Sequence, residues 1–170
     1  MNRRNLNPHK ESLENPYISE IRDINQQVLV LQGKTLVAVA EDRTVHPIKL
    51  RTAPCRDDSL EQSKGTAIYL GIADQKLCLS CAESGGQPIL KLEDKDIMIL
   101  YRTQKAEKSF VFYHNANGNT STFESAAYPG WFISSSKENG KPIKMTKDVG
   151  KDNVNFYFRL RIEPGLGQVA

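Results

Sequence analysis

Cys78 and Cys81 form a C-x-x-C pair, the spacing of many zinc sites and redox-active dithiols. A zinc site normally needs a second pair of ligands, and the remaining cysteine and the three histidines share no such spacing. The pair also lies in the apolar run 77–81, which predicts a strand rather than the helix start of a redox dithiol, with Cys81 on the face of Leu77 and Leu79. We therefore predict no metal site and no cofactor.

Other patterns that carry chemistry are incomplete. Gly33, Lys34 and Thr35 match the end of a phosphate-binding loop, but the upstream glycine is missing and no helix follows. The histidines belong to no serine or cysteine arrangement typical of a triad. The predicted strands also lack the basic and aromatic platform of nucleic-acid binders. We expect a protein that is not an enzyme, does not bind nucleic acid and presents its surface to another protein.

The elements that must position that surface are short. Apolar runs recur along the chain, each ended by Gly, Pro, Asn or Asp, which is typical of many β-strands joined by turns and predicts an all-β fold. In 68–72 and 156–162 apolar and polar residues alternate, so we expect one face packed and the other wet. A short helix is indicated only at 95–100. The runs are 28–31, 36–39, 48–50, 68–72, 77–81, 89–92, 110–113, 143–145 and 156–162.

Residues 123–135 are the stretch around which the chain is organised. They predict a strand, a tight turn and a second strand, because Pro129 fixes φ and Gly130 tolerates a positive φ. Trp131, the only tryptophan, is expected to bury a large apolar body and clamp the two strands. The apolar residues expected in the core on the two sides of the turn are Phe123, Phe132 and Ile133.

Length and composition favour one domain. The chain has 170 residues, 39% of them hydrophobic, and no apolar run approaches membrane-spanning length. Three cysteines cannot form a closed disulfide framework and suit a reducing compartment. The polar first residues carry no signal-peptide pattern. We expect a mobile arm at 1–16, one domain at 17–162 and a frayed tail at 163–170.

Two features leave alternatives open. The net charge of +3 comes entirely from residues 137–170, with seven basic and four acidic residues, while the rest balances at sixteen of each. These lysines either meet an acidic partner or heparin, or form a solvated face. The non-periodic stretch 53–66 is either a partner-binding loop or a tolerated insertion. The lysines concerned are Lys137, Lys141, Lys144, Lys147 and Lys151.

The organising stretch resembles the interleukin-1 family signature, with Ser135 where the family usually has threonine. Segments 68–72, 77–81, 87–92, 96–101 and 109–113 agree with the family in order, so the resemblance covers 21–162. Within the family the chain is most similar to the interleukin-36 group, through 23–32 and 121–125. The signature residues are Phe123, Ser125, Ala126, Pro129, Trp131, Phe132, Ile133 and Ser134, with Ile143 further on.

The resemblance implies a β-trefoil of about twelve strands with pseudo-threefold symmetry. It implies an extracellular pro-inflammatory cytokine that acts as a monomer, without membrane insertion. It also implies secretion by an unconventional route from a cytoplasmic precursor pool. Such a cytokine binds an interleukin-36-type primary receptor and then recruits the shared interleukin-1 receptor accessory chain.

The resemblance further implies activation by trimming. The family's aliphatic-x-Asp motif reads Ile21, Arg22 and Asp23 here, which places the cut near Ser12. The implied receptor surfaces are the new N-terminus with the first strand, the loop 53–65 and the loop 150–154 before the last strand. The candidate residues of the two loops are Arg56, Asp57 and Asp58, and Gly150, Lys151, Asp152, Asn153 and Val154.

Two rival functions share the expected fold. One is a receptor antagonist, which binds the primary receptor without recruiting the accessory chain. Gly150 and Lys151 resemble the agonists, whereas residues 125–129 are shared with the antagonist and the loop 150–154 is slightly shorter than in agonists. The other rival is a trefoil module that binds heparin or another carbohydrate through its lysines.

Overall fold

The computed structural model describes residues 16–161, with the backbone alone for Arg161. Strands dominate this part of the chain, which confirms the all-β prediction, and the expected short helix is present as α2. Within residues 16–161 no helix has the length and apolar character that a membrane crossing requires. The strands are β1 (Tyr17–Asp23), β2 (Gln27–Gln32), β3 (Thr35–Ala40), β4 (Leu50–Pro54), β5 (Thr66–Ile72), β6 (Leu77–Ser84), β7 (Gln87–Asp94), β8 (Val111–Asn117), β9 (Thr120–Ser125), β10 (Phe132–Ser134), β11 (Lys141–Pro142), β12 (Lys144–Thr146) and β13 (Phe156–Arg161). The helical elements are α2 (Ile97–Arg102) and the 3₁₀ turns η1 (Gln62–Lys64) and η2 (Lys108–Phe110).

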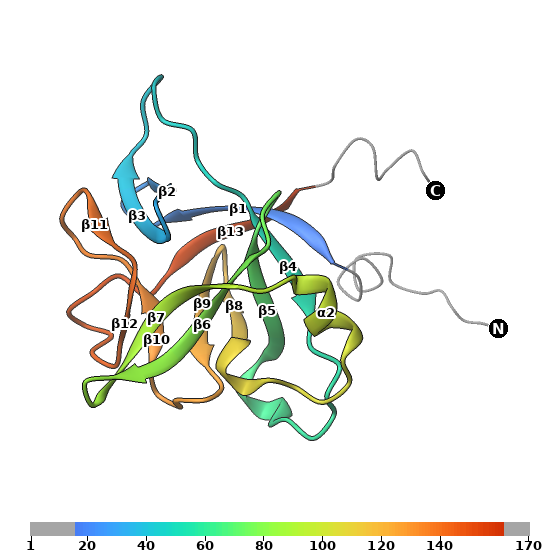
Figure 1. The fold of residues 1–170 in the computed structure, drawn as a ribbon. Helices are drawn as coiled ribbons and strands as arrows, with labels where there is room; N and C mark the ends of the chain where they lie inside the picture. Colours follow the sequence, from blue (N-terminus) through green and yellow to red (C-terminus); the bar gives the residue numbers. More distant parts are fainter. Residues whose placement is uncertain (1–15, 162–170) are drawn as a thin grey trace.

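Six strands close into a barrel. β1 pairs with β13 and β4, β13 pairs with β9, β9 with β8, β8 with β5, and β5 returns to β4, all of them antiparallel. Figure 1 shows these strands crossing at the centre of the molecule. Because the barrel is closed, β1 and β13 pair with each other and neither has a free edge there. The loops between the barrel strands therefore start and end on a rigid support.

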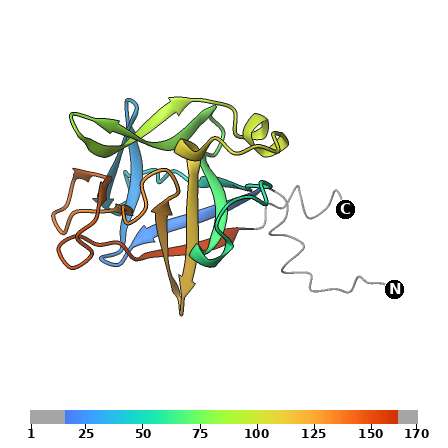
Figure 2. The same ribbon diagram turned by 90° about the horizontal axis from the view of Figure 1, so that it is seen from below.

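Three strand pairs extend from one side of the barrel. They are the hairpins β2–β3 and β6–β7 and the pair β10–β12, and they lie on the left in Figure 1. Figure 2 shows the same molecule from below, with the β6–β7 hairpin leading into the segment that carries α2. Each pair belongs to a stretch that also supplies two barrel strands, so the chain consists of three similar units. β11 is an addition that joins the third unit to β3.

The main core lies between the barrel and these strand pairs. Its buried side chains come from all three units and are almost entirely aliphatic or aromatic, as the apolar runs predicted. Phe112, Phe123 and Phe156 are fully buried at its centre. The other members include Ile21, Leu29, Leu36, Leu50, Ile68, Leu70, Ile72, Leu79, Cys81, Ile133, Ile143 and Met145.

A second apolar cluster corrects one prediction. Ile68, Leu70 and Ile72 of β5 face the main core, but Tyr69 on the opposite face is only 1% exposed rather than wet. Tyr69 packs with Cys78 in a cluster that also contains residues of α2 and the loop after β4. These segments cover the outer face of the barrel, so both faces of β5 are dry.

The turn between β9 and β10 follows the prediction. Gly130 has a φ of +87°, and the amide of Ser125 donates to the carbonyl of Trp131 at 2.8 Å. Phe123 and Ile133 are in the core, but Phe132 is half-buried because it alternates with Ile133 along β10. The indole of Trp131 is also only half-buried, so the prediction of a buried clamp is wrong. The ring instead packs against the outside of the main core.

Candidate functional site

The predicted motif at the end of β1 is mostly internal. Ile21 lies in the main core and Asp23 is 0% exposed. Arg22 reaches the surface, where its guanidinium lies 2.6 Å from the carboxylate of Glu41. This ion pair raises the pKa of Arg22. Of the three motif residues, only Arg22 therefore offers a side chain to a partner.

The Asp23 carboxylate organises the β1–β2 turn. Its Oδ1 atom accepts the backbone amides of Asn25 and Gln27, each at 2.9 Å, and its Oδ2 atom accepts the side-chain amide of Gln27 at 2.6 Å. The backbone amide of Gln26 donates to the Asp23 carbonyl and closes the turn. Gln26 itself has a φ of +66°. A buried carboxylate with this many donors fixes the shape of the turn.

A fourth donor links this turn to the far end of the chain. Ser135 Oγ donates to Asp23 Oδ2 at 2.7 Å. Ser135 in turn exchanges two backbone hydrogen bonds with Asn153, at 2.9 and 3.0 Å, and the side chain of Asn153 reaches Ser135 Oγ at 3.4 Å. The structure thus brings the predicted motif in β1 together with the predicted loop before β13.

The loop before β13 divides into an exposed tip and a buried stem. Gly150 and Lys151 are exposed, whereas Asn153 and Val154 are buried. The half-buried carboxylate of Asp152 lies 3.6 Å from the ammonium of Lys144. Only the tip is available for direct contact, and the stem positions it.

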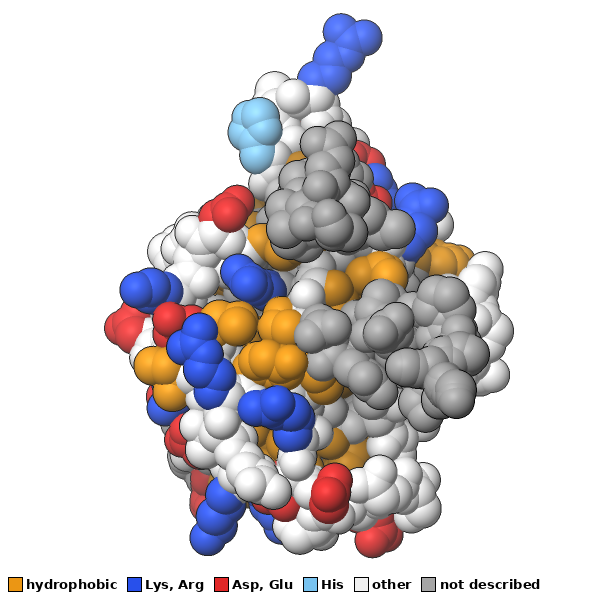
Figure 3. Space-filling view, turned by 90° about the vertical axis from the view of Figure 1, so that its right-hand side faces the viewer, with side chains coloured by type: hydrophobic (Ala, Val, Ile, Leu, Met, Phe, Trp, Pro, Cys, Tyr) orange, Lys and Arg blue, Asp and Glu red, His pale blue; other side chains and the backbone are white. Residues whose placement is uncertain are grey.

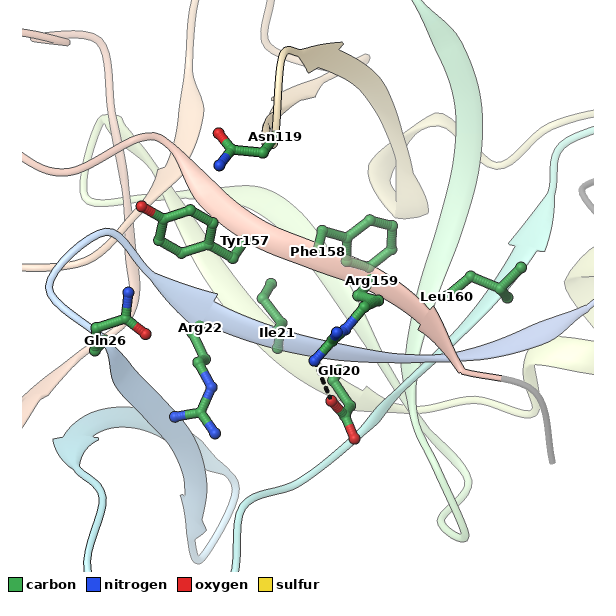
Figure 4. Close-up of a pocket in the computed structure, with 9 residues that line it drawn as sticks. All are labelled: Glu20, Ile21, Arg22, Gln26, Asn119, Tyr157, Phe158, Arg159 and Leu160. Atoms are coloured by element: carbon green, nitrogen blue, oxygen red, sulfur yellow. Dashed lines mark ion pairs between the residues drawn. The ribbon is translucent and has the colours of Figure 1, made fainter. Parts of the chain in front are cut away.

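A groove of about 640 Å³ runs along β1 and β13. In Figure 4, Arg159 and Glu20 are joined by an ion pair of 3.6 Å, with Leu160 beyond them on the right and Tyr157 and Asn119 toward the upper left. Charged and amide side chains line the groove together with the ring and aliphatic surface of Ile21, Tyr157, Phe158 and Leu160. Its lining residues are Glu20, Ile21, Arg22, Gln26, Asn119, Tyr157, Phe158, Arg159 and Leu160.

A histidine–serine contact beside this groove was missed by the sequence reasoning. The Nε2 atom of His114 lies 2.7 Å from the Oγ atom of Ser121. The imidazole ring stacks on Phe123 and makes an edge contact with Phe158. Burial lowers the pKa of His114, which favours the neutral imidazole. The turn Asn117–Gly118–Asn119 signals a hairpin whose register places these two side chains together, and that signal was available in the sequence.

The loop after β4 is tied to the segment around α2. The Arg56 guanidinium lies 4.6 Å from the ring centre of Tyr101, and its Nε donates to the Tyr101 carbonyl at 3.1 Å. Leu60 inserts into the second apolar cluster. The loop is therefore an ordered surface, although it has no regular strand.

Asp57 holds this loop from the other side. Its carboxylate accepts the backbone amide of Ala106 at 2.8 Å and both the amide and the hydroxyl of Ser59. These hydrogen bonds, that from Ala106 first, lower the pKa of Asp57 to about 2. Asp58 is exposed. Of the three predicted residues, Asp57 positions the loop, whereas Arg56 and Asp58 lie on its surface.

This second surface is separate from the first. In Figures 1 and 2 the loop after β4 lies beside α2, while the loop before β13 lies among the strand pairs on the other side of the barrel. Figure 3 views the side that carries α2, where hydrophobic side chains lie among lysines and arginines. Ile99 of α2 is one of the large apolar side chains exposed in the described residues.

Several predicted lysines are engaged within the chain. Lys141 lies 3.8 Å from Glu138, Lys144 pairs with Asp152, and the ammonium of Lys147 lies 5.6 Å from the ring centre of Trp131. Lys137 and Lys151 are exposed. The acidic neighbours reduce the positive field of this region.

The C-x-x-C pair is divided between the two apolar clusters. Cys81 lies in the main core and Cys78 in the second cluster, each fully buried. Burial raises the pKa of the Cys78 thiol to about 12 and also raises that of Cys81. Among residues 16–161 no three His, Cys, Asp or Glu side chains gather in a group that could hold a metal ion.

Comparisons with known proteins agree with this geometry. The family model described as Interleukin-1 / 18 matches residues 54–158. Interleukin-36 alpha of Homo sapiens is 46% identical over 146 residues, which cover 85% of this chain and 92% of that protein. The interleukin-36 receptor antagonist protein of Mus musculus is 40% identical over 146 residues, covering 82% and 91% respectively.

A solved structure matches the whole architecture. The NMR structure of the pro-inflammatory cytokine interleukin-36alpha superimposes with a TM-score of 0.77 at 43% identity, covering 88% of this chain and 96% of that one. The six-stranded barrel with its three strand pairs is thus a β-trefoil, as predicted. The described strands number thirteen rather than about twelve because of β11.

Proposed function

The chain belongs to the interleukin-1 family of cytokines, and on this premise we propose that it is a pro-inflammatory agonist of the interleukin-36 type. Members of this family are extracellular signalling ligands and not enzymes, so the protein acts by binding a cytokine receptor. Its specific partners in our proposal are the interleukin-36 primary receptor and the shared interleukin-1 receptor accessory chain. It binds them as a monomer.

One observation carries the proposal. The chain is 46% identical to human interleukin-36 alpha over 146 residues, and its candidate loops are held in place by hydrogen bonds to the buried Asp23 and the partly buried Asp57. Ordered loops bind with a smaller entropy cost than loops that must be fixed on binding. The exposed Gly150 and Lys151 at the tip of the loop before β13 support recruitment of the accessory chain.

Activation in this proposal requires trimming within the N-terminal arm, residues 1–16, which precedes the trefoil domain 17–162 and the tail 163–170. The cut near Ser12 lies outside the described residues. The first described strand begins at Tyr17, only a few residues beyond it. The protein leaves the cytoplasmic pool by an unconventional route before it is trimmed.

A receptor antagonist is the second candidate, and the 40% identity to the mouse interleukin-36 receptor antagonist favours it. An antagonist and an agonist of this group differ in whether the accessory chain is recruited, not in the fold. In our proposal, the exposed tip of the loop before β13 therefore determines whether the accessory chain is recruited, and so which of the two functions the protein has. The heparin alternative has less support, because acidic residues neutralise Lys141 and Lys144.

The test compares the full-length chain with a chain that begins at Ser12. Both are applied to cells that express the primary receptor and the accessory chain and carry an inflammatory transcription reporter, with cells lacking the primary receptor as control. We expect strong signalling from the trimmed chain alone. A trimmed chain that does not signal but blocks a known agonist would establish the antagonist. Signalling in the control cells would overturn the receptor assignment.

A further inference from the structure

Two asparagine–glycine pairs occur in the chain, Asn117–Gly118 and Asn139–Gly140. Both lie at exposed turns, the first in the β8–β9 hairpin and the second directly before β11. In such a pair the backbone nitrogen of glycine can attack the side-chain carbonyl of asparagine, because glycine has no side chain to hinder the approach. Asparagine is a thermolabile residue for this reason. The receptor binding proposed above involves neither pair.

The two pairs are alike in backbone conformation and in exposure. Gly118 has a φ of +67° and Gly140 a φ of +85°, and open space surrounds the position that a Cβ atom would take at each. The side chains of Asn117 and Asn139 are both exposed. Neither the conformation of the glycine nor the access of water therefore distinguishes the pairs. A difference in their reactivity has to come from their hydrogen bonds.

The Asn139–Gly140 pair is held at both reacting groups. The amide of Gly140 donates to the carbonyl of Ala38 at 2.8 Å, and the side-chain oxygen of Asn139 accepts the amide of Ala40 at 2.6 Å. These two hydrogen bonds tie the pair to β3. The attacking nitrogen and the attacked carbonyl group therefore approach each other only after both bonds have opened, which lowers the population of reactive conformers.

The Asn117–Gly118 pair lacks these restraints. Within residues 16–161, no hydrogen bond engages the backbone amide of Gly118 or the side chain of Asn117. The hydroxyl of Thr120 donates to the backbone carbonyl of Asn117 at 3.2 Å, and this contact leaves the side chain of Asn117 free to rotate. Both reacting groups of this pair are therefore available in the folded protein.

We propose that Asn117 is a site of spontaneous deamidation in the folded protein and that Asn139 is protected from the same reaction. The nitrogen of Gly118 loses its proton to water and bonds to Cγ of Asn117. The Cγ–Nδ2 bond breaks, and the leaving nitrogen takes up a proton and departs as ammonia. Water then opens the resulting succinimide ring. Cleavage of the new N–Cγ bond gives aspartate, and cleavage of the bond between the Gly118 nitrogen and the main-chain carbonyl carbon gives isoaspartate.

The reaction changes the tip of the β8–β9 hairpin. Either product replaces a neutral amide with a carboxylate. Isoaspartate also adds a methylene group to the main chain, which disturbs the pairing of Asn117 with Thr120. Asn119, two residues further on, lines the groove along β1 and β13 (Figure 4) and a second pocket of about 390 Å³ that His114 also lines. Deamidation of Asn117 therefore alters the hairpin at the border of both surfaces.

The test compares the native protein with the protein unfolded in guanidinium chloride, both incubated at pH 8. Peptide mass spectrometry follows the conversion of amide to acid, with fragmentation that distinguishes aspartate from isoaspartate. In the native protein we expect Asn117 to react about 25-fold faster than Asn139, because each of the two hydrogen bonds at Asn139 contributes a factor of about five. In the unfolded protein the two pairs should react at similar rates.

Asn117→Gln is the matched control. Its side chain keeps the amide but is one methylene longer, so it does not form the five-membered ring. The variant should lose the early product, which assigns that product to position 117 rather than to Asn115 or Asn119 in the same peptide. An early product that persists in Asn117→Gln would overturn the assignment.

Three further results would contradict the proposal. Equal rates at Asn117 and Asn139 in the native protein would show that the hydrogen bonds at Asn139 give no protection. A native Asn117 that stays intact while the unfolded chain reacts would show that the hairpin itself prevents the attack. Aspartate without any isoaspartate would point to direct hydrolysis rather than to attack by Gly118.

Hydrogen exchange measures the effect on the hairpin. In protein enriched in isoaspartate at position 117, exchange in the peptide 111–125 should rise about fivefold, the effect of losing one net hydrogen bond. Unchanged exchange would show that the product leaves the hairpin pairing intact and would overturn the structural consequence. Both measurements are made without a receptor, so their outcome is independent of the proposed function.

Discussion

The hydroxyl of Ser135 donates to the Oδ2 atom of Asp23 at 2.7 Å, joining residues 112 positions apart in the chain. Asp23 ends the first strand of the first unit, and Ser135 follows β10 in the third unit. The contact is buried, and the carboxylate accepts three further hydrogen bonds within its own turn. A buried charge is tolerated when it is satisfied in this way.

Removing this contact should destabilise the protein. In Asp23→Asn an amide group replaces one acceptor oxygen and faces donors, so the free energy of unfolding should fall by about 3 kcal/mol. Ser135→Ala leaves the carboxylate with its other donors and should cost about 1 to 2 kcal/mol. Urea denaturation followed by tryptophan fluorescence measures both values. An unchanged denaturation midpoint in Asp23→Asn would show that the carboxylate does not stabilise the fold.

Asp57 gives a prediction about how the order of the loop after β4 depends on pH. Its pKa is lowered to about 2, so its contribution to loop order is complete above the ordinary carboxyl range and is lost as the pH falls through about 2. At neutral pH, Asp57→Asn should speed amide exchange at Ala106, because the acceptor of that amide weakens. Asp58→Asn is the matched control. NMR exchange rates that are equal in the two variants would contradict the role of Asp57.

His114 gives a second prediction about pH, with the same sign but at a higher pH than that for Asp57. Burial lowers its pKa, so the unfolded chain takes up the proton first and stability falls as the pH drops below about 6.5. In His114→Gln this loss is absent, so the difference in unfolding free energy between pH 7 and pH 5 should be smaller than in the wild type. His46→Gln, at an exposed position, should keep the wild-type difference. Parallel pH profiles of all three proteins would refute this account.

Thiol reactivity checks the division of the cysteines. Cys78 and Cys81 are fully buried, and burial raises the pKa of both thiols, whereas Cys55 is half-buried. We expect one thiol to react quickly with an aromatic disulfide reagent at pH 8 in the native protein, and the other two only after unfolding. Cys55→Ser should abolish the fast phase. A fast phase that persists in Cys55→Ser would mean that the C-x-x-C pair is accessible.

The strands and the central turn followed from local patterns. Apolar runs ended by turn residues located most strands, and the Pro129–Gly130 pair placed the turn, because φ preferences act within a few residues. The run at 48–50 was displaced, since β4 begins at Leu50 and continues to Pro54. Boundaries of this kind depend on pairing with β1 and β5, which no local pattern encodes.

The second apolar cluster shows where alternation misleads. Tyr69 alternates with aliphatic residues, and alternation normally indicates a wet face. Here α2 and the loop after β4 cover that face, with Leu60 and Leu100 packing in the same cluster as Tyr69. A sequence pattern reports the polarity of a face but not which distant segment lies on it.

The candidate site was predicted in part. The motif residues and both loops were named from the resemblance, but burial divides them: Asp23, Asn153 and Val154 position the surface, whereas Arg22 and Lys151 lie on it. The pairing of Asp23 with Ser135 could not be predicted, because nothing local relates residues 112 apart. Closure of the barrel brings them together.

The central claim is that this protein signals by assembling two receptor chains. The most direct measurement is binding of the chain beginning at Ser12 to the purified extracellular domain of the interleukin-36 primary receptor, without and with the accessory chain, by surface plasmon resonance. The account predicts a binary complex that dissociates more slowly when the accessory chain is added. Binding that the accessory chain leaves unchanged would contradict agonism, and no binding to the primary receptor would contradict the account as a whole.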